Sequence, residues 1–159
     1  MASFADVESR EPEFAARVRA VFDAHEHKFL ATLRADGSPR ISGITMHFVA
    51  GEPWLAGMPD SVKFADLRRD PRFALHSGSS EPDAFSGDAK LSGRATEVTD
   101  PAERSSYARA AGVPKAMMHF VLFRVDLEQV VLVALDERKR ALAISSWRPG
   151  TGLTRTLRT

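Results

Sequence analysis

The stretch DSVKFADLRRDPR, residues 60–72, follows the predicted strand EPWLAGM and places a serine and a lysine two positions apart at the start of a short predicted helix. Asp70-Pro71 ends that helix, because the residue before a proline disfavours helical geometry. The first N–H groups of a helix lack intrahelical partners, and the helix dipole adds partial positive charge there. Ser61 and Lys63 in this first turn therefore point to a binding site for a phosphate group.

A simpler interpretation of the same turn is that Asp60 or Ser61 caps the helix while Lys63 is solvated. Arg40, on the strand expected to lie beside the one that leads into the helix, offers a guanidinium that could bind phosphate in a bidentate manner. Only five of the 22 lysines and arginines are lysines. Because arginine is this common, the position of Arg40 alone carries little weight.

The flanking sequence predicts a mainly β fold. KFLATLR and PRISGITMHFV are separated by the turn Asp36-Gly37, which is typical of a β-hairpin. Helices are predicted at residues 11–26, 61–70 and 100–112. Further strands are predicted at residues 53–58, 72–78, 89–99, 120–135 and 140–147. Six or seven strands joined by short turns, with three helices between them, indicate an antiparallel barrel or sandwich with helical cover.

Length and composition predict one soluble domain over residues 1–159, with a helical segment at 1–26 and a polar tail at 150–159. No apolar run approaches the roughly 18 residues of a membrane helix, and no secretory signal is recognisable. With no cysteine, these features predict a cytoplasmic protein. A net charge of +1 argues against nucleic-acid or membrane partners.

Four segments stand in the order typical of one protein family. They are ATLRADGSPRISGI, WLAGMPDSVKFADLRRDPRFAL, GDAKLSGRATEV and SSWRPG, and they lie between about residues 28 and 150. The series resembles the FMN-binding split-barrel family of pyridoxamine 5'-phosphate oxidase, in particular its small actinobacterial-type relatives. The S-x-K pattern followed by L-x-x-D-P-R is its most specific part.

The resemblance implies a six- to seven-stranded antiparallel split β-barrel that binds FMN at a homodimer interface. In that family an arginine of the second strand and the serine and lysine after the third hold the flavin phosphate, and these positions match Arg40, Ser61 and Lys63. The remaining positions implied for the cofactor are Ile41, Ser42, Gly57 and Met58 beside the ring, and Trp147 and Arg148 from the partner subunit.

The implied activity is that of a flavin-dependent oxidoreductase that transfers hydride to or from a small-molecule substrate. The chain departs from the oxidases proper at Val62, where those enzymes have an arginine, and their C-terminal Arg-x-His is not recognisable in LTRTLRT. Activity on pyridoxamine phosphate is therefore not expected.

Two alternatives stay open on the same fold. Some relatives resemble users of the deazaflavin coenzyme F-420, whose longer acidic tail could bind Arg68, Arg69 and the basic C-terminal tail. The other alternative is a protein that binds or senses a flavin or haem without turnover. The sequence contains no Ser/His/Asp order, nucleophile elbow or paired-carboxylate motif, which fits both a flavin enzyme and a non-catalytic protein.

The five histidines do not predict a metal site, because none has a companion carboxylate at a recognised zinc spacing. His47 and His76 fall on predicted strands. Both are interpreted as partly buried polar residues, either of which could contact a ligand.

Overall fold

The computed structural model describes residues 2–79, 87–136, 138 and 140–159. The strands in this part of the chain are β1 (His27–Leu33), β2 (Pro39–Val49), β3 (Glu52–Gly57), β4 (Arg72–His76), β5 (Asp88–Glu97), β6 (Val121–Asp136), β7 (Ala141–Arg148) and β8 (Gly152–Arg158). The helices are α1 (Phe4–Arg10), α2 (Pro12–Asp23), α3 (Val62–Arg69), α4 (Pro101–Ala110) and the short 3-10 helix η2 (Lys115–Met117).

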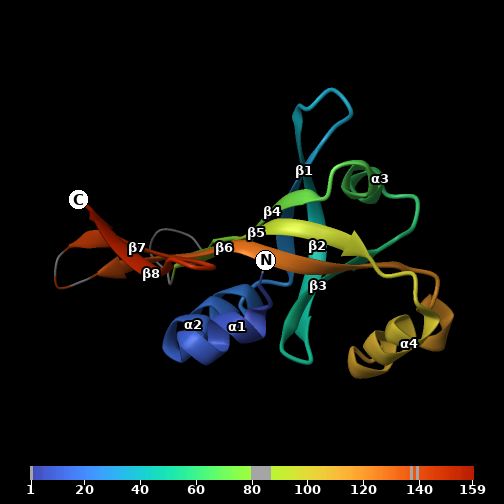
Figure 1. Cartoon of the computed structure of the whole chain (residues 1–159), viewed down its shortest axis with the longest axis horizontal. Helices are drawn as coiled ribbons and strands as arrows, with labels where there is room; N and C mark the ends of the chain where they lie inside the picture. The colour runs from blue at the N-terminus through green and yellow to red at the C-terminus, as the bar shows by residue number, and fades with distance from the viewer. Residues whose placement is uncertain (1, 80–86, 137, 139) are drawn as a thin grey trace.

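The strands form one antiparallel sheet in the order β3-β2-β1-β4-β5-β6-β7-β8, and β3 pairs with β6 as well. This additional pairing closes β1 to β6 into a barrel, while β7 and β8 extend the sheet to one side (Figure 1). The predicted mainly β fold with an antiparallel split barrel is confirmed. The described strands number eight, of which six make the barrel.

Strand β6 belongs to both parts of the sheet. Its first residues pair with β3, from Val121 opposite Gly57 to Arg124 opposite Trp54. Its second half, residues 130–136, pairs with β7. One continuous strand therefore links the barrel to the extension.

The N-terminal segment forms two helices, where the sequence predicted one. In α1 the Ser3 hydroxyl accepts from the backbone N–H of Asp6 at 3.1 Å and the Asp6 carboxylate accepts from that of Ser3 at 2.8 Å, which is a capping box. Phe4 and Val7 are the buried residues of α1. Only two buried positions in a seven-residue helix give a weak periodic signal, which is why the sequence pattern did not predict α1.

The C-terminal tail is a strand. The sequence indicated only a polar tail, because residues 152–158 show no alternation of polar and apolar side chains. In the structure β8 pairs with β7 from Gly152 opposite Arg148 to Arg158 opposite Leu142. Its side chains are mostly exposed, so backbone pairing with β7 holds this strand in place.

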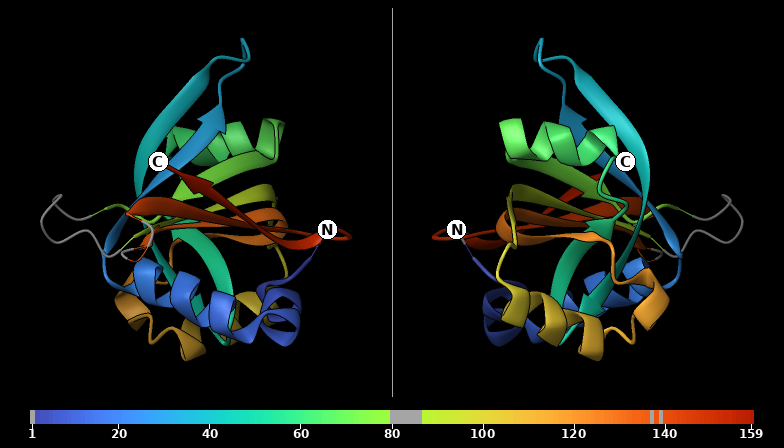
Figure 2. Two further views of the ribbon diagram at one scale, coloured as in Figure 1. Left: turned by 90° about the vertical axis from the view of Figure 1, so that its left-hand side faces the viewer. Right: turned by 90° about the vertical axis from the view of Figure 1, so that its right-hand side faces the viewer.

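Helix α3 lies on the opposite side of the barrel from α1 and α2, as Figures 1 and 2 show. Phe64 and Leu67 of α3 are buried in the core that the barrel strands share with α1 and α2. The ring of Phe64 stacks on that of Phe123 of β6, with centroids 5.3 Å apart. No helix in the described part of the chain is long and apolar enough to cross a membrane.

Strands β5 and β6 approach each other closely at a register shift between Ser92 and Gly93. A Cβ atom added at Gly93 would lie 1.9 Å from the carbonyl oxygen of Asp126. Only glycine fits at position 93 without a shift of the backbone. Glycine is common where the pairing of two strands is irregular.

Replacing Gly93 by alanine is expected to lower the free energy of unfolding by about 2 kcal/mol or more, because the backbone of β6 must move to admit the methyl group. Urea denaturation followed by circular dichroism measures this change. Gly43→Ala is the matched control, since a Cβ atom added at this position of β2 would meet nothing within 4 Å. An equal decrease in the free energy of unfolding in Gly93→Ala and Gly43→Ala would contradict the close approach of β5 and β6.

Candidate functional site

A surface hollow of about 330 Å³ lies where β1, β2 and β3 meet the first turn of α3. Its lining consists of His27, Gly43, Ile44, Thr45, Ala56, Gly57, Met58, Ser61 and Lys63. Gly43, Ala56 and Gly57 carry no side chain or only a methyl group, so backbone forms part of the wall. A flat ligand can therefore approach the strands closely.

The end of β3 fixes one wall of this hollow. Gly57 is the last residue of β3, and a Cβ atom there would lie 2.9 Å from the Cε2 atom of Phe64. Because the Phe64 ring is buried and stacked on Phe123, it has little freedom to move away. Glycine at position 57 thus allows α3 to pack directly against the strand that precedes it.

The first turn of α3 is not capped by a side chain. Ser61 occupies the N-cap position, and no side chain of the described residues caps the helix. The backbone N–H groups of Phe64 and Ala65 donate to the Ser61 carbonyl at 3.0 and 3.4 Å. The N–H groups of Val62 and Lys63 precede them and have no intrahelical partner. The simpler interpretation is therefore correct in that Ser61 is the N-cap residue, but the Ser61 side chain makes no capping hydrogen bond.

The Lys63 side chain reaches from α3 to β2. Its Nζ donates a hydrogen bond to the carbonyl oxygen of Gly43 at 3.2 Å and lies 5.6 Å from the ring centroid of Phe64. An ammonium group has three donors, so two are available after this contact. Ser61, Lys63 and the free N–H groups of the helix thus place donors and positive charge at one end of the hollow.

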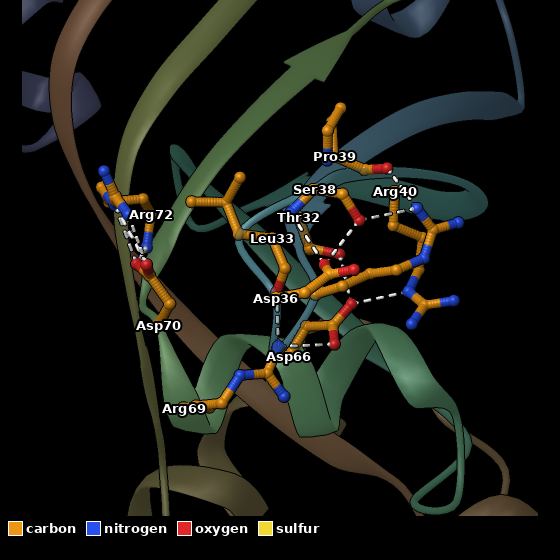
Figure 3. Close-up of polar contacts among 11 residues, drawn as sticks. Thr32, Leu33, Asp36, Ser38, Pro39, Arg40, Asp66, Arg69, Asp70 and Arg72 are labelled. Carbon is orange, nitrogen blue, oxygen red and sulfur yellow. Dashed lines mark hydrogen bonds and ion pairs between the residues drawn. The ribbon is translucent and has the colours of Figure 1, made fainter.

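Arg40 lies on β2 outside the lining of the hollow, next to α3. Its Nε donates to Oδ2 of Asp66 at 2.6 Å, and the Thr32 hydroxyl donates to the same oxygen at 2.9 Å. Nη2 of Arg69 donates to Oδ1 of Asp66 at 2.9 Å. Figure 3 shows the three side chains around the Asp66 carboxylate, which is 3% exposed. One buried carboxylate therefore joins β1, β2 and α3.

The surroundings of Asp66 shift its acidity. Burial alone would raise the pKa of this carboxyl group, but the hydrogen bonds from Arg40, Arg69 and Thr32 outweigh burial and lower the pKa from 3.8 to about 2. Asp66 is thus ionised at neutral pH. Its one negative charge stands between two guanidinium groups, which leaves the cluster with a net positive charge.

The structure brings together four of the nine residues that the sequence suggested for a cofactor. Gly57, Met58, Ser61 and Lys63 all line the hollow. Arg40, Ile41 and Ser42 lie further along β2. Ile41 is 75% exposed on the outer face of the barrel, and Ser42 is half-buried.

Trp147 and Arg148 lie on β7, in the extension. Trp147 is 1% exposed within the core of its own chain, and its Nε1 has no hydrogen-bond partner among the described residues. The resemblance assigned this ring to a ligand of the partner subunit, whereas in this structure it packs within its own chain. Arg148 is exposed, and its Nη2 donates to Oε1 of Gln129 at 2.8 Å.

Two residues of the site were not singled out from the sequence. His27 lines the hollow because it begins β1 opposite Thr45 of β2. Asp66 is the one acidic residue within α3, and only the three-dimensional packing reveals its partners. Of the other histidines considered, His76 is partly buried and accepts from the backbone N–H of Gly78 at 3.0 Å, whereas His47 is exposed.

These residues fit a flat ligand that carries a phosphate group. The uncapped first turn of α3, the Ser61 hydroxyl and the Lys63 ammonium supply donors for an anion. The small residues of β2 and β3 supply a wall for the flat part. The chain thus offers one polar end and one open, largely apolar wall.

The chain is similar to a known protein family. The family described as Pyridoxamine 5'-phosphate oxidase matches residues 14–134. No curated protein sequence matches the chain. Members of this family commonly bind flavins.

Several solved structures share the fold at low sequence identity. PhzG from Burkholderia lata 383, in complex with tetrahydrophenazine-1-carboxylic acid, is similar with a TM-score of 0.68 at 14% identity, over 97% of this chain and 94% of that one. The conserved hypothetical protein Rv2991 from Mycobacterium tuberculosis has a TM-score of 0.61 at 22% identity, over 72% and 81%. A heme binding protein from Mycobacterium smegmatis has a TM-score of 0.59 at 22% identity, over 89% and 56%.

The Asp66 cluster predicts how stability depends on pH. Because the folded pKa of about 2 lies below the ordinary value of 3.8, the ionised carboxylate stabilises the fold above about pH 4. That contribution, on the order of 2 kcal/mol, is lost as the pH falls towards 2. Asp66→Asn is therefore expected to lower the free energy of unfolding at pH 7 and to weaken its dependence on pH between 4 and 2.

Chemical denaturation at a series of pH values measures both effects. Asp60→Asn, in the exposed segment before α3, is the control and should change neither. An Asp66→Asn variant with the stability and the acid dependence of the wild type would show that the cluster does not stabilise the fold.

Proposed function

The chain belongs to the pyridoxamine 5'-phosphate oxidase family, and on that premise we propose that it binds FMN at a homodimer interface as an oxidoreductase. A bound flavin would supply hydride transfer to or from a small-molecule substrate. The protein would bind the cofactor, orient it and exclude water. The observation that carries this proposal is the uncapped N-terminus of α3, with Ser61 and Lys63, at one end of the hollow.

The phosphate group of FMN would bind at this helix N-terminus. The N–H groups of Val62 and Lys63, the Ser61 hydroxyl and the Lys63 ammonium converge there. Arg40 lies beside the same helix and adds a guanidinium. The phosphate dianion of FMN would thus be bound by positive charge from both α3 and β2.

The flat ring of the flavin would lie along β2 and the end of β3. The backbone from Gly43 to Thr45 and the small residues Ala56 and Gly57 allow close approach. The imidazole of His27 also lines the hollow. It is the residue of the lining best suited to hold or move a proton near a bound substrate.

An exposed apolar surface next to the hollow supports a homodimer. We call it the outer patch, a depression of about 230 Å³ lined by the apolar residues Phe29, Ala31, Ile41, Ala74 and Leu75 and by the polar residues His76 and Lys90. Leu75 forms its buried floor. Phe29 and Ile41 are 53% and 75% exposed. Contiguous exposed apolar residues of this kind mark interaction surfaces.

The outer patch and the hollow share one face of β2. Residues Ile41, Gly43 and Thr45 alternate with inward-facing ones, so all three point outwards. The rise along a strand places Gly43 roughly 7 Å from Ile41. A second copy that covers the outer patch would therefore also border the hollow. Arg148 of that copy, which is exposed, suits a contact to the ligand better than the buried Trp147.

The contacts of two arginines favour FMN over the deazaflavin F-420. Nε and Nη2 of Arg68 donate to the Glu97 carboxylate at 2.6 and 2.7 Å. Arg69 pairs with Asp66. Both arginines that could have bound a longer acidic tail thus already have acidic partners within the chain.

The non-catalytic alternative has one observation in its favour. The heme binding protein from Mycobacterium smegmatis shares this fold. The absorption spectrum of the purified protein distinguishes a flavin, a deazaflavin and a haem. Reduction of a bound flavin by NADH or NADPH, followed by reoxidation with an acceptor, would support an oxidoreductase, and a flavin that never reacts would support binding alone.

Replacing Lys63 by alanine is expected to weaken FMN binding about tenfold or more, because a charge-assisted hydrogen bond to phosphate is lost. Binding of riboflavin, which lacks the phosphate, should change little. Fluorescence titration with both ligands measures the two dissociation constants.

Lys115→Ala, at an exposed lysine of η2, is the control for a general effect of charge and should leave both constants unchanged. Thermal unfolding of both variants tests whether the fold is intact. Equal FMN affinity in the wild type and Lys63→Ala would overturn the role of this lysine in phosphate binding.

Replacing Phe29 by aspartate is expected to convert the dimer to a monomer, because a charge would be buried in the outer patch. The same variant should bind FMN more weakly, since the partner borders the hollow. Sedimentation at several protein concentrations measures the first effect and titration the second. Leu157→Asp, on the exposed face of β8, is the control. A wild-type chain that sediments as a monomer with bound FMN would overturn the interface.

A further inference from the structure

We propose that Asp66 is a positioning residue that holds the Arg40 guanidinium in place for the phosphate of the ligand. This inference rests on the proposed function, because it assigns a second role within the same site. It concerns a buried carboxylate that the sequence did not single out and that does not line the hollow.

The contact between the two side chains leaves Arg40 able to bind an anion. Asp66 accepts from Nε of Arg40, and this is the only hydrogen bond that Arg40's side chain makes within the described ranges. Both Nη groups therefore keep their donors. A guanidinium held through Nε can still present its two Nη groups to a phosphate in a bidentate manner.

The position of Asp66 on the helix places this guanidinium near the first turn of α3. Asp66 follows Lys63 by three residues and Val62 by four, which is one helical turn of about 5.4 Å. Nε of Arg40 lies 2.6 Å from the Asp66 carboxylate. Arg40 is thus attached to α3 one turn beyond the N–H groups that begin the helix.

The contacts of Asp66 divide between its two oxygens. Oδ2 accepts from Thr32 and Arg40, which are opposite each other on β1 and β2. Oδ1 accepts from Arg69, one turn further along α3. Arg69 can therefore be removed without a direct change to the Arg40 contact, which separates the two roles of the carboxylate.

The charge of the cluster also suits an anion. Two guanidinium groups share one carboxylate, so the cluster keeps a net positive charge. Arg40's side chain is 24% exposed, whereas that of Asp66 is 4% exposed. The positive group thus faces solvent and the negative group is covered. Arginine side chains lose much rotamer freedom on binding, and a partner that fixes the side chain beforehand reduces this cost.

The test compares the affinity for FMN with the affinity for riboflavin, since the ratio reports the phosphate alone. The wild type is expected to prefer FMN. Asp66→Asn is expected to lower this preference about fivefold or more, because the amide binds the guanidinium more weakly than a carboxylate. Arg69→Lys is the matched control: it changes the other ion pair of Asp66 but keeps the positive charge of the cluster, and it should keep the preference of the wild type.

A double-mutant cycle shows whether Asp66 acts through Arg40. In an Arg40→Gln background, Asp66→Asn is expected to cause no further loss of the FMN preference. A loss as large as in the wild-type background would overturn the positioning role. Equal preference in the wild type and Asp66→Asn would overturn it as well.

Arg40→Lys covers the case in which Asp66→Asn does not fold. Lysine keeps the positive charge, but its single nitrogen cannot replace a guanidinium that donates to Asp66 through Nε and to the phosphate through both Nη groups. Arg40→Lys is therefore expected to lose the preference for FMN over riboflavin, as Arg40→Gln does. A lysine variant with the preference of the wild type would overturn the inference. A wild-type chain that binds FMN no more tightly than riboflavin would instead overturn the proposed function itself.

Discussion

The pairing of β3 with β6 is the constraint on which the rest of the structure depends. These strands lie far apart in the sequence, and their ladder closes the barrel from Trp54 opposite Arg124 to Gly57 opposite Val121. Because the ladder ends at Gly57, the chain leaves the barrel there and begins α3 a few residues later. Phe64 then stacks on Phe123, which belongs to the same ladder. Barrel closure therefore fixes where the first turn of α3 lies.

The second constraint is electrostatic. A carboxylate as buried as that of Asp66 is unfavourable unless its charge is compensated, and here Arg40, Arg69 and Thr32 provide that compensation. The same contacts tie α3 to β1 and β2. Stability and the arrangement of charge near the hollow thus depend on one side chain.

Local sequence signals predicted the parts of this structure that depend on short-range chemistry. The hairpin turn at Asp36-Gly37 and the end of α3 at Asp70-Pro71 both follow from residues adjacent in the chain. The alternation of apolar residues predicted the barrel strands, and the resemblance placed the family correctly. Ser61 and Lys63 were recognised as a pair because they lie in one helical turn.

The remaining features depend on contacts between distant residues, which no local pattern encodes. The exposed side chains of β8 gave no strand signal, because backbone pairing with β7 alone forms this strand. The resemblance assigned Trp147 to the cofactor of the partner subunit and gave no indication that its ring would pack into the core of its own chain. Likewise, Asp66 stood in a helix with basic neighbours, and only the packing of α3 on β1 and β2 showed its partners.

The two ends of the proposed site differ in what one chain can provide. The polar end would need only one chain, because Ser61, Lys63 and the start of α3 all line the hollow of that chain. The wall for the ring is open to solvent and lies beside the outer patch on the same face of β2. A second copy that covers this patch would remove water from the ring and bury apolar surface in one step. A ligand that binds only the assembled form stabilises that form by mass action. Cofactor binding and dimer formation would therefore be thermodynamically linked, with the phosphate end as the part of the site that each chain supplies alone.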